Sequence, residues 1–235
     1  MRIGILGLPQ SGKKTLFTLL TGRQVPDTRR ADESIEGVAS IRDPRVDVLY
    51  DICQPKKKVY AENHYVLCPD IAIGSGKREW LEASRRCDLL CMVVRAFESD
   101  AVFHPDGSVD AARDRANLDT ELILADMELV EKRLERLSRE AKAGATREQK
   151  LQKAGLEKCL ATLEEEKPLT ETVLDEEEME ELRGLNLLTL KTILWTYNVS
   201  EDGLSEGSGE GNFSISAQIE AEISEIDDPE ERKEF

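Results

Sequence analysis

The chain has 235 residues and a formal net charge of −16, from 48 acidic and 32 basic side chains. This length accommodates one domain with an inserted segment, or two small domains. The acidic balance disfavours direct contact with nucleic acid, which requires a basic surface. No apolar run reaches the roughly 18 residues of a membrane-spanning helix, and the N-terminal segment is too quickly interrupted for a secretion signal. We therefore expect a cytoplasmic protein that does not contact a membrane.

Strands and helices alternate over the first 96 residues. Short apolar runs bounded by turn residues predict strands, and apolar residues at helical spacing predict helices. The polar stretch 24–40 has no apolar period and predicts a loop. The strands are predicted at 2–7, 59–68 and 89–96, and the helices at 13–20, 44–52 and 78–86.

A long charged segment interrupts this alternation. Leucines recur at helical spacing between residues 118 and 166, with a break at Ala143-Gly144-Ala145. This pattern predicts two helices that form an antiparallel hairpin, or coiled coil. Lys167-Pro168 ends the second helix. Asp175 begins a shorter helix, whose acidic first turn suits the helix dipole.

The α/β pattern returns after residue 187. We predict strands at 190–197 and 213–216, a loop at 203–212, and a helix at 219–226. The predicted fold is therefore α/β, with a mostly parallel sheet that is interrupted by a helical hairpin.

Five cysteines occur, and no pair of them has the CxxC spacing of a metal site. Buried free thiols are the favoured interpretation over a metal site. The two histidines, His64 and His104, lie far apart and have no cluster of metal-ligating residues beside them. We predict that each is an ordinary surface or core residue.

A phosphate-binding loop is the strongest motif. Residues 7–13 read Gly-Leu-Pro-Gln-Ser-Gly-Lys, which fits GxxxxGK between a predicted strand and a predicted helix. In such a loop the backbone N–H groups and the helix N-terminus hold phosphate oxygens, and the lysine reaches the β- and γ-phosphates. The predicted phosphate-binding residues are Gly7, Gln10, Ser11, Gly12, Lys13, Lys14 and Thr15.

One position in this motif is unusual. Where the motif has a serine or threonine that binds Mg²⁺, this chain has Lys14. Thr15 carries a hydroxyl, but the side-chain direction rotates by about 100° per helix residue. Two interpretations remain open: a harmless change of register that leaves Thr15 as a metal ligand, or the loss of a direct ligand.

Three further fragments, each after a predicted strand, fit a nucleotide-binding domain. Asp70 could orient Mg²⁺ through water. Asn198-Val199-Ser200-Glu201 lies where phosphate-loop GTPases have the base-recognition motif Asn-Lys-x-Asp, and Ser216-Ala217 lies where they have a second base-contacting loop. Together with the phosphate loop, these fragments predict a P-loop NTPase fold similar to a G domain.

The chain resembles the YchF family of Obg-like ATPases over essentially its whole length. The resemblance rests on Gly7-Leu8-Pro9, Lys13, Asp43-Pro44-Arg45, the segments 93–98, 120–126 and 188–191, Asn198-Val199-Ser200-Glu201-Asp202-Gly203, and 220–223.

The resemblance implies a function and a domain organisation. ATP is the implied nucleotide, preferred over GTP, and the ribosome or a stress-response protein is the implied partner. The base pocket is formed by Asn198, Val199 and Glu201 with Ser216 and Ala217. A carboxylate such as that of Glu201 accepts a hydrogen bond from an exocyclic amine, adenine's included. The family has a helical hairpin inside its nucleotide domain, which agrees with the bounds that the residue pattern predicts: 1–117 and 186–235 for the nucleotide-binding domain and 118–185 for the hairpin insert.

The chain departs from the family pattern at several functional positions. The positions of the family's two direct Mg²⁺ ligands align with Lys14 and Ala31. The glycine of its second switch aligns with Ile73, and a histidine proposed to assist hydrolysis aligns with Met92. Because the position of that histidine holds Met92, the catalytic residue stays unassigned. Family members also continue past the position of Phe235 into a TGS domain.

From these departures we expect nucleotide binding with slow or lost hydrolysis. In this hypothesis Lys14 replaces part of the metal's charge and bridges a phosphate and Asp70, as a compact ammonium can. One alternative is a functional ATPase or GTPase-type hydrolase that holds Mg²⁺ through Thr15, Asp70 and water. A second alternative is a scaffold without hydrolysis that uses the hairpin for protein contacts.

Overall fold

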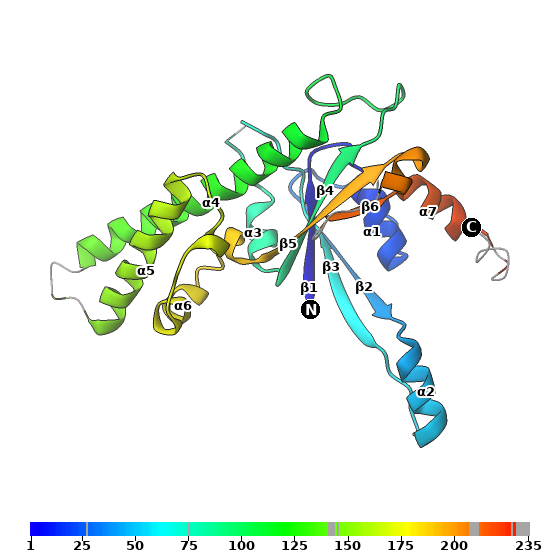
Figure 1. Ribbon diagram of the computed structural model, residues 1–235, viewed down its shortest axis with the longest axis horizontal. Coiled ribbons are helices and arrows are strands. Elements are labelled where there is room, and N and C mark those ends of the chain that lie inside the picture. The colour runs from blue at the N-terminus through cyan, green and yellow to red at the C-terminus, as the bar shows by residue number, and fades with distance from the viewer. Residues whose placement is uncertain are drawn as a thin grey trace.

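The computed structural model describes residues 1–26, 28–74, 76–140, 144, 146–206, 212–226 and 228. Its centre is a six-stranded sheet with the order β2-β3-β1-β4-β5-β6 (Figure 1). All neighbouring strands run parallel except β2 and β3. The predicted α/β fold is confirmed. The strands are β1 (Arg2–Gly7), β2 (Ile35–Ile41), β3 (Ala61–Leu67), β4 (Leu89–Ala96), β5 (Thr192–Val199) and β6 (Asn212–Ile215).

Strand β2 corrects the prediction of a loop over residues 24–40. It lies at one edge of the described sheet and pairs with β3. Of its seven residues, Ile35 alone is buried. An edge strand with two largely exposed faces lacks the apolar alternation on which strand prediction depends.

Helices cover both faces of the sheet. Helix α1 packs against one face through the fully buried Phe17, while α3 and α4 pack against the other around Trp80 and Leu118. None of the described helices is long and apolar enough to span a bilayer. The helices are α1 (Lys13–Thr21), α2 (Pro44–Cys53), α3 (Leu81–Arg85), α4 (Ala111–Glu140), α5 (Arg147–Glu164), α6 (Glu176–Arg183) and α7 (Ala217–Ser224).

Several element boundaries differ from the prediction. Helix α3 is shorter than 78–86, because residues 79 and 80 form a turn. Helix α4 begins before residue 118, since its first turns pack on the sheet. Residues Leu188–Leu190 form a short 3₁₀ helix that precedes β5.

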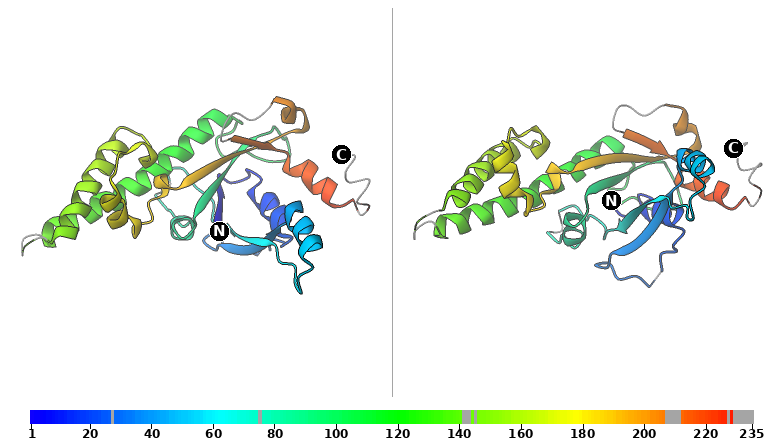
Figure 2. Two further views of the ribbon diagram at one scale, coloured as in Figure 1. Left: turned by 60° about the horizontal axis from the view of Figure 1, so that its bottom comes forward. Right: turned by 90° about the horizontal axis from the view of Figure 1, so that it is seen from below.

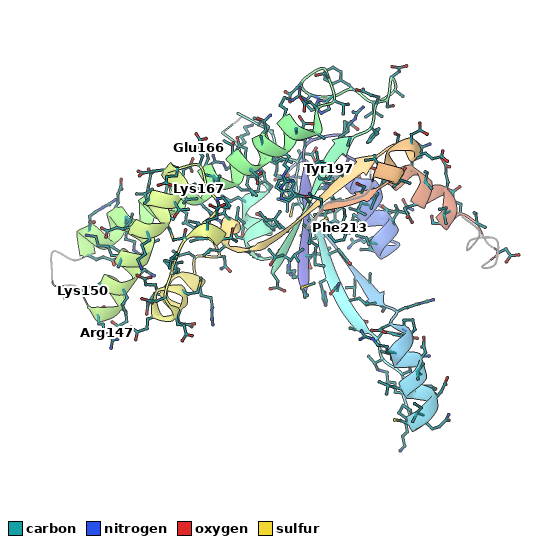
Figure 3. The ribbon with its side chains drawn as sticks, viewed as in Figure 1. Arg147, Lys150, Glu166, Lys167, Tyr197 and Phe213 are labelled. Atoms are coloured by element: carbon teal, nitrogen blue, oxygen red, sulfur yellow. The ribbon has the colours of Figure 1, made fainter. Side chains whose placement is uncertain are left out.

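The predicted helical hairpin is present. Helix α5 runs back along α4 (Figure 1). Leucines of both helices pack with Val130 of α4 in a second apolar core that also includes α6. Thr146 and Asp175 each begin a helix with a reciprocal capping box. Figure 3 shows Arg147 and Lys150 at the outer end of α5, far from the sheet. The predicted turn at 143–145 lies outside the described residues except for Gly144.

Buried polar contacts connect the hairpin to the sheet. The Asp126 carboxylate on α4 accepts hydrogen bonds from the backbone N–H groups of Leu188 and Thr189, at 3.0 and 2.8 Å, and from the Thr189 hydroxyl at 2.9 Å. Arg115, also on α4, lies 4.7 Å from the Trp195 ring and donates to the Tyr197 hydroxyl, which lies on β5 (Figure 3). These contacts fix α4 against the sheet.

Helix α2 differs from the others because none of its residues is buried. It lies at the far end of β2 and β3, on the side of the molecule away from the hairpin (Figures 1 and 2). Its last residue, Cys53, is exposed, contrary to the expectation of buried thiols. Cys68, Cys87 and Cys159 are buried as expected, and Cys91 is half-buried.

Candidate functional site

The phosphate loop connects β1 to α1 in a conformation that requires glycine. Gly12 has φ 92° and precedes the first residue of α1, and Gln10 has φ 62°. A Cβ atom at Gly7 would overlap the carbonyl oxygen of Val93 on the neighbouring strand β4. The loop therefore lies close against the sheet and leaves the N-terminus of α1 uncovered for an anion.

Lys13 is directed into this loop. Its side chain is only 3% exposed, and its Nζ atom donates to the carbonyl oxygen of Leu8 at 2.8 Å and pairs with Asp70 Oδ1 at 2.7 Å. Burial lowers the pKa of the Lys13 ammonium, and the Asp70 carboxylate partly opposes that effect. Lys14, in contrast, is exposed. In this structure the partner of Asp70 is thus Lys13, and the bridging role of Lys14 stays a prediction.

Two adjoining cavities surround the loop. The larger, of about 650 Å³, contains every residue of the predicted base pocket, and the smaller, of about 210 Å³, contains Lys13, Lys14 and Asp70. Gln10, Gly12 and Thr15 line both cavities. The structure therefore brings together the sequence-predicted residues Gln10, Ser11, Gly12, Lys13, Lys14, Thr15, Asp70, Asn198, Val199, Glu201, Ser216 and Ala217.

Asn198 joins the two nucleotide motifs. It is 5% exposed, its Nδ2 donates to the Ser11 carbonyl oxygen at 3.1 Å, and its Oδ1 accepts from the Ala217 backbone N–H at 3.0 Å. One amide side chain thereby fixes the distance between the phosphate loop and the loop that begins α7. A Cβ atom at Gly12 would overlap Asn198 Nδ2, which is a second reason for glycine there.

The remaining base-pocket residues lie at the ends of β5 and β6. Ser216 precedes α7 and accepts from the Ile219 N–H. Glu201 is exposed and begins a short 3₁₀ helix directly after β5. Val199 packs close to Gly203, where a Cβ atom would lie 2.9 Å from that of Val199. These positions leave the Glu201 carboxylate accessible to a ligand.

The sequence analysis missed one wall of the larger cavity. Phe97, Glu98 and Val102 line it. The buried Arg95 holds this wall by donating to the carbonyl oxygens of Phe97 and Val102, at 3.1 and 3.0 Å. The available signal was topological, because ligands of parallel α/β sheets bind beyond the carboxyl ends of the strands, and this segment follows β4.

Comparison with known proteins identifies the family. No family model matches the chain. The Ribosome-binding ATPase YchF of Haemophilus ducreyi is 34% identical over 249 residues, covering 97% of this chain and 68% of that protein. The Escherichia coli O157:H7 and Bacillus subtilis proteins of the same name are 35% and 34% identical, and 69% of each is covered. The chain belongs to the YchF family.

A solved structure agrees with this assignment. The YchF GTPase of Schizosaccharomyces pombe matches the fold with a TM-score of 0.81 and 28% identity, covering all of this chain and 70% of that one. The YchF resemblance inferred from the motifs is thereby confirmed.

Two positions where Mg²⁺ ligands were expected carry side chains that do not ligate the ion, whereas Thr15 lines both cavities. Lys14 has no lone pair when protonated, and Ala31 lies exposed in a turn without a side-chain oxygen. Asp70 is already paired with Lys13. Met92 is fully buried in the sheet core, where it would not reach a phosphate. Within the described ranges no three His, Cys, Asp or Glu side chains converge on one point.

Proposed function

We propose that this chain binds a purine nucleoside triphosphate across the two cavities and acts as a nucleotide-gated switch with weak hydrolysis. The observation that carries the proposal is the Asn198 bridge, which holds the phosphate loop and the base loop around a cavity large enough for a nucleotide. The names of the relatives, ribosome-binding ATPases and a GTPase, support a nucleotide ligand.

ATP is the proposed nucleotide, preferred over GTP. Glu201 stands where a GTPase has the aspartate that pairs with guanine, and Val199 stands where it has the lysine. The exposed Glu201 carboxylate can accept from the exocyclic amine of either purine. The proposed preference for ATP therefore rests on the family resemblance, with Glu201 as the residue that contacts the base.

Weak hydrolysis follows from the missing metal ligands. Phosphoryl transfer depends on positioning and on neutralising charge rather than on covalent chemistry. Because Lys14 and Ala31 stand at both positions of direct metal ligands, the rate of hydrolysis falls more than the affinity for the nucleotide. A functional ATPase that uses Thr15, Asp70 and water remains the alternative, and Thr15 lines both cavities.

Titration with fluorescent ATP and GTP analogues, each with Mg²⁺ and with EDTA, tests the proposal. We expect ATP to bind more tightly than GTP and EDTA to have little effect. The double variant Lys14→Ser, Ala31→Thr restores two hydroxyls and should make binding depend on Mg²⁺. If wild-type binding already requires Mg²⁺, the alternative is supported. If neither nucleotide binds, the proposal is wrong.

The ribosome is the proposed partner, because the curated relatives carry the name ribosome-binding ATPase. This partner implies a cytoplasmic location. The hairpin insert, proposed as residues 118–185, has its own apolar core and projects from the sheet (Figure 1). It also supports the second candidate, a scaffold, since Val173 between α5 and α6 is 87% exposed. Cosedimentation with ribosomes in the presence of ATP, ADP or neither separates a switch from a scaffold that ignores the nucleotide.

A further inference from the structure

The P-loop lysine already has an anionic partner inside the protein. Lys13 Nζ lies 2.7 Å from Asp70 Oδ1 and 2.8 Å from the Leu8 carbonyl oxygen. The Lys13 side chain is 3% exposed, while that of Asp70 is 43% exposed. Water therefore reaches the carboxylate much more readily than it reaches the ammonium. A ligand phosphate that approaches Lys13 meets Asp70 at the same position.

Asp70 lies at one end of the nucleotide site. It lines the smaller cavity and does not line the larger one, which holds Asn198, Glu201 and Ser216. The stretch between the two ends is formed by residues that line both cavities, Gly12 among them. A nucleotide with its base beside Glu201 consequently extends its terminal phosphate toward Asp70.

A triphosphate brings a second negative charge to this end, where Lys14 and Arg29 are nearby basic groups whose charges act on Lys13. The positions that would hold a metal cation directly carry Lys14 and Ala31, and Lys14 is the one other basic side chain among the residues that line the smaller cavity. The Asp70 carboxylate and the terminal phosphate then compete for one buried ammonium. Like charges a few ångströms apart near a protein surface repel each other, and this repulsion is enough to alter nucleotide choice.

We infer that Asp70 is a specificity-determining residue that makes the metal-free pocket select a nucleoside diphosphate over a triphosphate. The Asp70 carboxylate occupies the place beside Lys13 that a terminal phosphate would take. Both nucleotides bring a β-phosphate to Lys13, but a triphosphate adds a further negative group beside the Asp70 carboxylate. This inference rests on the proposed nucleotide binding: both nucleotides bind, and Asp70 sets their relative affinity when no metal is present.

The experiment is competition of unlabelled ADP and ATP against fluorescent ADP in EDTA. Wild-type protein should prefer ADP. Asp70→Asn removes the competing charge and keeps the side-chain shape, so ATP affinity should rise by about tenfold, which is 1.4 kcal/mol, and ADP affinity by much less. Asp51→Asn on α2 removes the same charge far from the site and should leave the ATP-to-ADP ratio unchanged. Thermal unfolding of all three proteins verifies that each is folded.

The outcomes separate this inference from the proposed function. If wild-type protein binds ATP as tightly as ADP and Asp70→Asn leaves the ratio unchanged, the role of Asp70 is wrong while nucleotide binding stands. If Asp70→Asn weakens ATP instead, Asp70 assists the terminal phosphate, and the inference is overturned. If Asp51→Asn changes the ratio equally, net charge rather than position is responsible. If no nucleotide binds, both proposals fall.

Discussion

Replacing Asn198 by alanine should destabilise the fold and abolish nucleotide binding together. The substitution removes two hydrogen bonds, from Nδ2 to the Ser11 carbonyl oxygen and from the Ala217 N–H to Oδ1. Each is worth about 1 kcal/mol, and leaving the buried Ala217 N–H without a partner costs about 1–3 kcal/mol more. Because Ala217 is 3% exposed, water does not easily replace the lost acceptor. We expect the free energy of unfolding to fall by about 3–5 kcal/mol.

Urea unfolding followed by circular dichroism measures this loss. Asn198→Asp is the matched comparison, since one carboxylate oxygen still accepts from Ala217 while the other faces the Ser11 carbonyl oxygen. The repulsion there and the buried charge should destabilise it at least as much as Asn198→Ala. A change below about 0.5 kcal/mol for Asn198→Ala, the range of ordinary surface substitutions, would refute the bridging role.

Gly12→Ala should eliminate nucleotide binding in the same fluorescence titration, because its Cβ would overlap Asn198 and its φ of 92° disfavours alanine; unchanged affinity would contradict the loop geometry. Asp126→Asn should lower the free energy of urea unfolding by about 1–3 kcal/mol, since an amide accepts poorly from three donors. Burial raises the pKa of Asp126, so the folded state holds the proton more tightly than the unfolded state does. The contribution of Asp126 to stability therefore falls as pH rises from the ordinary carboxyl pKa through the raised one, and Asp126→Asn should flatten that slope above the ordinary carboxyl pKa. The exposed Cys53 should react with a thiol reagent in the native protein, whereas Cys159, whose pKa burial raises to about 11, should react only after unfolding; equal rates would contradict the packing of the hairpin.

The sequence predicts the site better than it predicts the edges of the fold. Glycine spacing and strand-end polar residues identify the phosphate and base loops, because backbone geometry there permits few residue types. The exposed strand β2 gives no such signal. The hydrogen bond between Asn198 and Ser11 joins residues that are 187 positions apart in the sequence. The ion pair of Lys13 with Asp70 also joins residues that only the tertiary fold brings together. Neither contact has a local pattern, so the structure was needed to find them.

The isolation of α2 has a consequence for local stability. A ten-residue helix is marginal in water unless tertiary packing supports it, and α2 buries none of its residues. What holds it are its two ends and a surface contact with the segment before β3. The Asp43 side chain accepts from the Arg45 N–H, Gln54 ends the helix in a left-handed conformation, and Asp47 contacts Lys58 and Tyr60. Its amide protons should therefore exchange with solvent long before those of β1, and this segment can unwind and reform while the nucleotide site stays intact.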